Sequence, residues 1–121
     1  MTGVQTCALP IWVPGLLKQW FDSVLLKGWA YGEGGTALAG KDVLWAVTTG
    51  GDEEAFTPQG RHGHAFGAFV PAIEQTARFC GMGWLEPHVV HGAHRVDDAA
   101  LAASARAFRD RLVAWREGGA A

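Results

Sequence analysis

Apolar residues recur at intervals of three and four positions in three stretches of this sequence, which predicts three amphipathic helices. The first is expected to begin at Pro14, which suits the first helical turn, and to end at Gly28. The second is expected to begin at Pro71 and to end at Gly81. The predicted buried faces consist of Leu17, Trp20, Phe21, Val24 and Leu25 in the first helix, and of Ile73, Thr76, Ala77 and Cys80 in the second. Cys80 is therefore predicted to be a core residue rather than a nucleophile.

The third predicted helix lies near the end of the chain, where Asp97 or Asp98 can cap its first turn. Its predicted buried stripe consists of Leu101, Ala105, Phe108, Leu112 and Trp115. Four arginines fall around this stripe: Arg106, Arg109, Arg111 and Arg116. We interpret these arginines as a solvated face of the helix.

Two apolar runs between the helices predict strands. Residues 43–47 are rich in β-branched and aromatic side chains, which is typical of a strand buried on both faces. Residues 89–91 predict a second, short strand. The order helix, strand, helix, strand, helix is an α/β pattern, although two strands are too few for a sheet that buries its faces independently.

The first predicted strand is followed by Thr48, Thr49, Gly50 and Gly51, here called the TTGG loop. Ligands of open parallel α/β sheets bind at the carboxyl ends of the strands. Glycines let the backbone approach a ring or a phosphate without a Cβ clash, and threonine hydroxyls add hydrogen-bond donors. The TTGG loop is therefore a candidate cofactor site, and the alternative is an ordinary tight turn.

Composition narrows the classes of function. A chain of 121 residues and 12.9 kDa with 49% hydrophobic residues is expected to form one small domain. Ten basic and twelve acidic residues without a basic cluster argue against a nucleic-acid partner. The sequence has neither an apolar run of about 20 residues nor a signal-peptide pattern, so we expect a soluble, cytoplasmic protein. Cys7 and Cys80 are too few for a disulfide framework.

Residues 1–11 show neither strand alternation nor a helical period. Their order is similar to a common high-throughput sequencing adaptor translated in frame, and we interpret them as an artefact of sequence assembly. The alternative is a disordered N-terminal arm. The domain itself is expected to span residues 12–121.

Several short motifs, taken in order, resemble a single family. They are Trp29-Ala30-Tyr31-Gly32, Gly40-Lys41, Trp45-Ala46-Val47 with the TTGG loop, Thr76-Ala77, Cys80-Gly81, Trp84-Leu85, Pro87, Arg111-Leu112 and Trp115. Over residues 14–118 their order and spacing resemble the flavodoxin-like NAD(P)H:quinone oxidoreductases. Within that family they are most similar to the ancillary flavoproteins of bacterial glutathione-gated potassium efflux systems.

The resemblance implies a flavodoxin-like α/β fold, with a parallel sheet of strand order 2-1-3-4-5 and the cofactor at its switch point. This chain is expected to be the C-terminal part of that fold, with about two strands and three helices. The family's first two strands, its phosphate-binding loop and nearly all of its third strand would precede Trp12, so they have no counterpart in this sequence.

The resemblance also implies a site and an activity. The TTGG loop matches the loop that contacts the flavin ring, which implies FMN, with FAD as the alternative, and NAD(P)H and a quinone as the two substrates. His62 matches a histidine that handles the proton in some members, whereas Phe56 stands where those members have a tyrosine. Tyr31 matches an aromatic residue that lines the substrate site. The intact family members are expected to be homodimers.

Two classes of function are consistent with this resemblance. One is a flavin-dependent quinone reductase. The other is a regulatory subunit that docks on the cytoplasmic side of a potassium efflux transporter and raises its activity, which would place it at the periphery of the inner membrane. A third possibility is an inert fragment whose exposed strand edge at residues 43–47 promotes aggregation.

The histidines do not predict a metal site. His88, His91 and His94 are three positions apart, and on an extended strand this spacing turns successive side chains to opposite faces. We therefore expect no shared metal ion at this strand.

Overall fold

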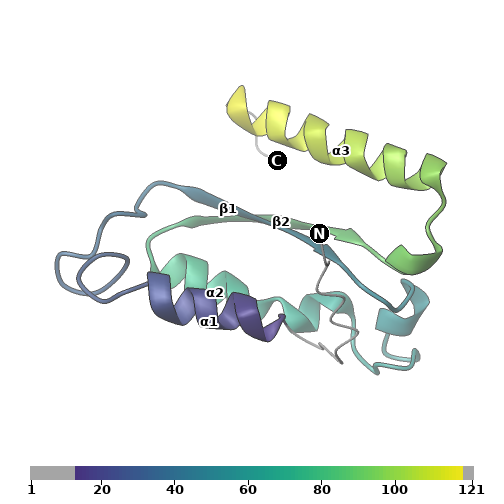
Figure 1. Cartoon of the computed structure of the whole chain (residues 1–121), viewed down its shortest axis with the longest axis horizontal. Coiled ribbons are helices and arrows are strands. Elements are labelled where there is room, and N and C mark those ends of the chain that lie inside the picture. Colours follow the sequence, from purple (N-terminus) through teal and green to yellow (C-terminus); the bar gives the residue numbers. More distant parts are fainter. Residues whose placement is uncertain (1–12, 119–121) are drawn as a thin grey trace. The chain divides into compact units, whose positions relative to one another are not determined.

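The computed structural model describes residues 13–118, so the predicted leader and Cys7 lie outside the described residues. Helices and strands alternate along the chain in the predicted α/β order, with three short 3₁₀ turns between them (Figure 1). The described chain divides into two compact units. One contains the chain up to Lys41 together with Phe69–Gly83, and the other contains Asp42–Ala68 together with the chain from Trp84 onward.

Helix α1 of the first unit spans Gly15–Val24 and is shorter than predicted. Pro14 is its N-cap, with an extended ψ of 141°, rather than its first helical residue. After Leu25, whose amide still donates to the Phe21 carbonyl, the helical pattern ends: the Leu26 amide donates to the Val24 carbonyl and the Gly28 amide donates to the Tyr31 carbonyl. Gly28 adopts a φ of 84°, which closes this turn without a Cβ clash.

Helix α2, also in the first unit, spans Pro71–Phe79 and confirms its prediction. Ile73, Ala77 and Cys80 are buried, as their spacing indicates, whereas Thr76 of the predicted face is half-buried. Burial raises the pKa of the Cys80 thiol, because removal from water disfavours the thiolate. Cys80 is therefore a core residue and a poor nucleophile.

The second unit is built on a two-stranded sheet of β1 (Asp42–Thr48) and β2 (Gly83–Val90). The strands are parallel, since the Gly83 amide donates to the Lys41 carbonyl at one end and the Thr49 amide donates to the Val90 carbonyl at the other. Their carboxyl ends therefore meet at the same edge of the sheet, as the α/β prediction requires.

Two expectations about these strands are wrong in detail. The side chains of β1 are half-buried or exposed rather than buried on both faces, because β2 is its only strand neighbour within residues 13–118. Strand β2 begins at Gly83, well before residue 89, and it includes Pro87. Proline has no amide to donate, and an edge strand tolerates it because one side of the strand needs no ladder partner.

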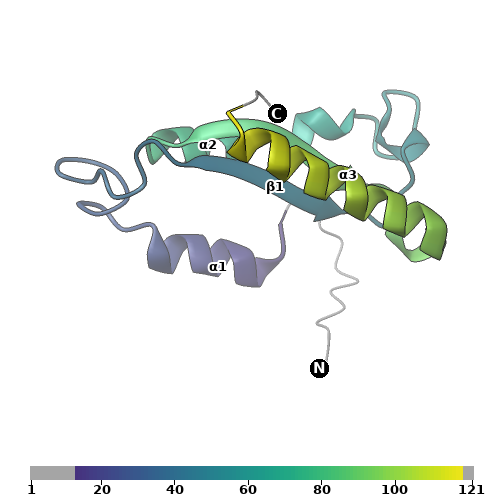
Figure 2. The same cartoon turned by 90° about the horizontal axis from the view of Figure 1, so that it is seen from above.

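Helix α3 spans Asp98–Arg116, and Asp97 is its cap, accepting a hydrogen bond of 2.8 Å from the Ala100 amide. Within the second unit the helix runs alongside the sheet in both views (Figures 1 and 2). It is tied to β2 by a contact of 2.9 Å between His88 Nε2 and Ser104 Oγ. Near its other end, Trp115 Nε1 donates to an Asp42 carboxylate oxygen of β1 at 2.7 Å.

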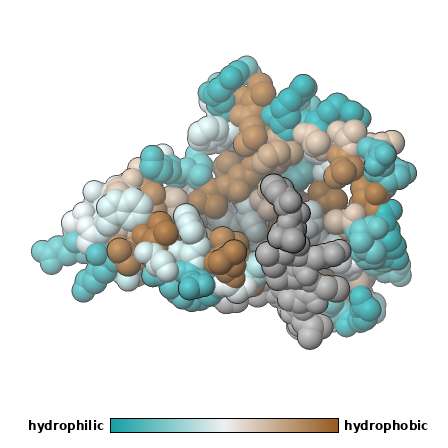
Figure 3. Space-filling view, in the orientation of Figure 1, coloured by the Kyte–Doolittle hydropathy of each residue, from teal (hydrophilic) through white to brown (hydrophobic). Residues whose placement is uncertain are grey.

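The predicted buried stripe of α3 is wrong. Leu101 and Leu112 are 54% and 42% exposed, and hydrophobic surface lies between hydrophilic side chains over this helix (Figure 3). Phe108 and Trp115 of the predicted stripe contact the sheet, and so do Ser104 and Arg111, which the stripe does not include. Arg111 is not part of a solvated face, because its guanidinium donates to the carbonyls of Glu86 and Pro87. Polar anchors therefore decide which face of α3 turns toward the sheet.

Candidate functional site

The candidate site lies at the carboxyl end of β1, where the TTGG loop is joined to the loop after β2. That second loop consists of residues 91–95 and is here called the His91 loop. The Ala93 amide donates to the Thr49 carbonyl at 3.0 Å, and the Gly92 amide donates to the Gly51 carbonyl at 2.7 Å. The two loops therefore form one hydrogen-bonded rim at the end of the sheet.

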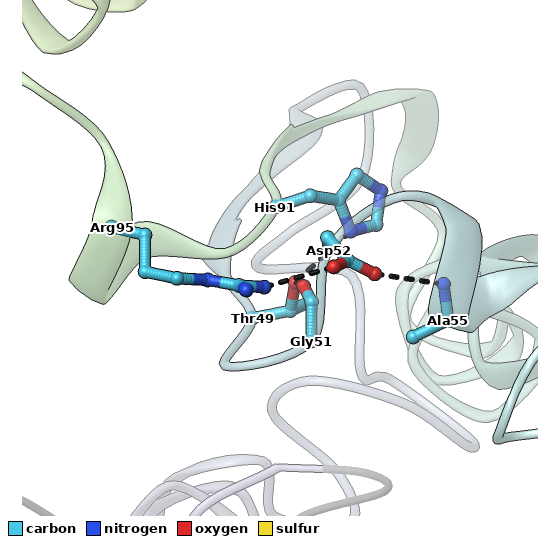
Figure 4. A network of polar contacts seen from close by, with 6 residues as sticks. All are labelled: Thr49, Gly51, Asp52, Ala55, His91 and Arg95. Atoms are coloured by element: carbon cyan, nitrogen blue, oxygen red, sulfur yellow. Dashed lines mark hydrogen bonds and ion pairs between the residues drawn. The ribbon is translucent and has the colours of Figure 1, made fainter.

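Thr49 adds a side-chain link to this rim (Figure 4). Its hydroxyl lies 2.7 Å from the Gly51 carbonyl oxygen and 2.9 Å from Nδ1 of His91. A half-buried hydroxyl with two partners is held in one rotamer. Thr49 therefore fixes the shape of its own loop rather than presenting a free hydroxyl, whereas Thr48 is exposed at the last position of β1.

The two glycines of the TTGG loop have opposite surroundings. A Cβ added at Gly50 would meet no atom within 4 Å, whereas one added at Gly51 would lie 3.2 Å from Ala55, Phe56 and His62. Gly51 is thus covered by the protein's own side chains. The open backbone at Gly50 is the part of the loop that a planar ligand can approach, so these residues fit the flavin ring that the sequence predicts.

A cluster of aromatic rings lines the loop. The rings of Phe56 and His62 are 4.4 Å apart at an angle of 34°, and Phe56 also lies 5.2 Å from the ring of His91. Phe66 contacts the rings of both His91 and Trp45, each at 5.6 Å. His62 was predicted from the sequence, but the contributions of His91 and Phe66 were not. The position of His91 directly after the carboxyl end of β2 is the signal that could have identified it.

Backbone hydrogen bonds place His62 beside this cluster. The His62 amide donates to the Ala55 carbonyl at 3.0 Å, just after the 3₁₀ turn η1 (Glu54–Phe56). The second 3₁₀ turn of this region, η2 (Phe66–Phe69), begins with the aromatic ring that contacts His91. The short turns thus bring side chains from an irregular segment onto the strand end.

Tyr31, which the resemblance places at the substrate site, belongs to the first unit. Its ring packs on Phe79 at 4.9 Å and an angle of 42°. The structure thus brings His62 and the TTGG loop together in one unit, while Tyr31 lies in the other. Its place at a substrate site stays a prediction.

Asp52 follows the TTGG loop and links it to the His91 loop by charge (Figure 4). One carboxylate oxygen accepts a hydrogen bond of 3.0 Å from the Ala55 amide, and the other pairs with the Arg95 guanidinium at 2.9 Å. The Ala55 hydrogen bond, and after it the Arg95 hydrogen bond and charge, hold the pKa of the Asp52 carboxyl below its ordinary value. Both partners favour the ionised carboxylate.

We expect the substitution Arg95→Gln to raise the pKa of Asp52 while leaving it below the ordinary value, because the larger contribution of the Ala55 amide remains. Since the pKa is lowered in the folded state, this carboxylate stabilises the protein above the unfolded pKa of about 4, and the contribution disappears as the pH falls through the folded value. An NMR titration of the Asp52 carboxyl carbon would measure the shift. Arg109→Gln is the matched control, since Arg109 pairs with Asp110. An unchanged Asp52 titration in Arg95→Gln would contradict the assignment.

Within residues 13–118 no three His, Cys, Asp or Glu side chains are grouped so that they could hold a metal ion. His88 contacts α3, whereas His91 contacts the TTGG loop. No helix in the described part of the chain has the length and apolar character needed to cross a membrane.

A parallel β-α-β arrangement with a glycine-containing loop at the carboxyl end of a strand is typical of open-sheet α/β proteins, whose ligands bind at this edge of the sheet. A family model described as the flavodoxin-like fold matches residues 8–112. The chain belongs to this flavodoxin-like family, as its motifs predict.

Curated relatives include the glutathione-regulated potassium-efflux system ancillary protein KefF of Salmonella newport and of Salmonella typhimurium. Both are 50% identical to this chain over 105 residues, which are 87% of this chain and 58% of the relative. The chain thus spans little more than half the length of the curated relatives that it matches.

Solved structures confirm the fold. An NADPH-quinone reductase from P. pentosaceus has a TM-score of 0.73 at 28% identity, over 79% of this chain and 56% of its own. General stress protein 14 of Treponema denticola, solved with FMN, has a TM-score of 0.68 at 35% identity, over 87% of this chain and 57% of its own. A structure described as a thermophilic tryptophan halogenase from Streptomycin violaceusniger has a TM-score of 0.76 at 39% identity, over 82% of this chain and 58% of its own. Because these proteins are described with different activities, the shared fold alone does not select a function.

Proposed function

We propose that this chain contributes the flavin-ring site of an NAD(P)H:quinone oxidoreductase that uses FMN, with FAD as the alternative cofactor. The observation that carries the proposal is the open backbone at Gly50, which directly precedes the glycine that packs against Phe56 and His62 at the carboxyl end of β1. The quinone reductase of P. pentosaceus and the FMN complex from Treponema denticola support this choice among the activities that the fold hosts.

The residues of the proposed site would have two roles, binding the flavin ring and transferring a proton. When bound, the flavin supplies two-electron transfer from NAD(P)H to a quinone. Thr48 and Gly50 would hold the ring, because both are exposed at the strand end. His62 can accept or donate a proton, and it packs on Phe56. Since a phenyl ring carries no proton to donate, Phe56 cannot share one with His62, and any relay must involve His62 without it.

A titration of this 121-residue chain with FMN, followed by quenching of flavin fluorescence, tests the proposal. We expect saturable binding with a dissociation constant of about 1 μM or tighter. FAD measured in parallel compares the two cofactors, and quinone-dependent oxidation of NADH and of NADPH by the loaded protein then tests turnover. Absence of saturable binding by a monodisperse sample would exclude a flavin site in this chain. Aggregation would instead support the inert-fragment hypothesis, which predicts intermolecular pairing through the edge of β1.

A second candidate function is regulation of a potassium efflux transporter, favoured by the 50% identity to KefF. Under this proposal the protein docks on the cytoplasmic side of the transporter, and it would be a peripheral protein of the inner membrane. Potassium efflux from transporter-containing vesicles, measured with and without this chain, tests it directly. Stimulation by a flavin-free sample would separate the regulatory role from the enzymatic one. Sedimentation of the sample tests the homodimer that the family resemblance predicts.

A further inference from the structure

The contact between Thr49 and His91 indicates which nitrogen of the His91 imidazole carries a proton. The Thr49 hydroxyl has one proton, and it lies within hydrogen-bond distance of both the Gly51 carbonyl oxygen and His91 Nδ1. A carbonyl oxygen can accept a hydrogen bond but cannot donate one, so the hydroxyl proton must point to Gly51 if that bond forms. Both contacts are then satisfied only when His91 Nδ1 carries a proton and donates it to the hydroxyl oxygen.

We propose that His91 is a positioning residue for the flavin-ring loop, holding the TTGG loop in its binding shape through an Nδ1–H donor to Thr49. This inference rests on the proposed flavin site, and it adds a residue on the neighbouring strand end that sets the loop's geometry. The order of donation runs from His91 to the Thr49 hydroxyl and from that hydroxyl to the Gly51 carbonyl.

The imidazole is itself held in place, which is what a positioning residue requires. Its ring lies 5.2 Å from Phe56 at an angle of 42° and 5.6 Å from Phe66 at 84°, so an aromatic neighbour limits rotation in two directions. His91 also directly precedes Gly92, which is buried and has a φ of 59°. The backbone on one side and the two rings on the other thus define where Nδ1 points.

The Gly51 carbonyl is the point at which this chain of donors meets the backbone rim. It accepts from the Thr49 hydroxyl and also from the Gly92 amide, at 2.7 Å each. Two donors on one carbonyl fix the peptide that joins Gly51 to Asp52, beside the open backbone of Gly50. Fixing a glycine pair before the ligand arrives lowers the entropy cost of binding.

Four substitutions distinguish the effect of the hydrogen bond between His91 and Thr49 from the effect of the aromatic packing of the His91 ring. His91→Phe keeps the aromatic packing and removes the donor, whereas His91→Asn keeps an N–H donor near the Nδ1 position and removes the ring. Thr49→Val removes the hydroxyl and Thr49→Ser keeps it. His94→Phe is the matched control, since His94 is an exposed histidine on the same loop. Thermal unfolding identifies any variant that has lost its fold.

The first measurement is made without flavin, so that it does not depend on the proposed function. Long-range ¹H–¹⁵N correlations of the unmodified protein are expected to show a protonated Nδ1 on His91. Hydrogen exchange of the Gly92 amide is expected to be about fivefold faster in His91→Phe and Thr49→Val, and less than twofold faster in His91→Asn, Thr49→Ser and His94→Phe.

The second measurement repeats the FMN titration with the same variants, and affinity is expected to fall in the same order and by about the same factors. An unprotonated Nδ1 on His91 in the unmodified protein would overturn the proposal, whatever the variants do. Unchanged Gly92 exchange in His91→Phe would also overturn it. If FMN fails to bind the unmodified chain while the tautomer and exchange results hold, the flavin proposal fails and the His91–Thr49 link stands as a structural device alone.

Discussion

The substitution Gly60→Ala is expected to lower the free energy of unfolding by about 2–4 kcal/mol. A Cβ at this position would lie 2.7 Å from the Ala55 carbonyl oxygen and closer still to the Glu54 carbonyl oxygen. These backbone atoms cannot move away cheaply, because the Ala55 carbonyl accepts from the His62 amide and the Gly60 amide donates to the Thr57 carbonyl. The strain would therefore be concentrated in the turn that positions His62.

Denaturant unfolding of Gly60→Ala measures this loss, and Gly67→Ala is its matched control. A Cβ at Gly67 would meet no atom within 4 Å, and the residue is not among those with a left-handed φ. Replacing an unstrained glycine by alanine stabilises a protein by about 0.4–1 kcal/mol. We therefore expect the two variants to change stability in opposite directions. Equal changes in the free energy of unfolding would show that the close backbone contacts around Gly60 do not require a glycine at that position.

The elements that the sequence predicts well are those in which burial follows the helical period. In α2 the buried residues Ile73 and Ala77 lie at the spacing that the helical period predicts, although Phe79 at its last position is 63% exposed. In α3 the apolar pattern selected Leu101 and Leu112, whereas Arg111 faces the sheet to donate to two carbonyls of β2. A hydropathy pattern assigns every arginine to the solvent-exposed face, so it cannot predict an arginine whose guanidinium binds a helix to a strand.

The candidate site was predicted in part for a similar reason. A strand end and a glycine pair are local features, so the position of the TTGG loop follows from the sequence together with the rule for ligands in open sheets. The partnership between Thr49 and His91 joins residues that are 42 positions apart, and it exists only because the two strands are parallel and in register. The register of the two strands cannot be predicted from the residues around either Thr49 or His91 alone. The sequence therefore predicts the position of the candidate site and His62 beside it, but not the support that His91 and Phe66 give.

The substitution Gly50→Val is expected to weaken FMN binding by about 10–100-fold, or about 1.4–2.8 kcal/mol, with little change in the free energy of unfolding. The space around Gly50 is open to a side chain, and its φ is not in the left-handed region, so a valine costs the fold little. In the proposed complex the same space is filled by the flavin ring, so a branched side chain there would exclude the ligand rather than strain the protein. Gly50→Ala is expected to have a smaller effect in the same direction.

The neighbouring glycine gives the contrast that makes this prediction specific. A Cβ at Gly51 would press on Phe56 and His62 at 3.2 Å, so Gly51→Ala is expected to lower stability and affinity together. Fluorescence titration and denaturant unfolding of both variants distinguish a residue that faces the ligand from one that faces the core. If Gly50→Val bound FMN as tightly as the unmodified chain, the ring could not lie over this loop, and the assignment of the strand end as the flavin site would have to be abandoned. Loss of affinity at unchanged stability in Gly50→Val, together with loss of both in Gly51→Ala, is the outcome expected if the ligand contacts the backbone at Gly50.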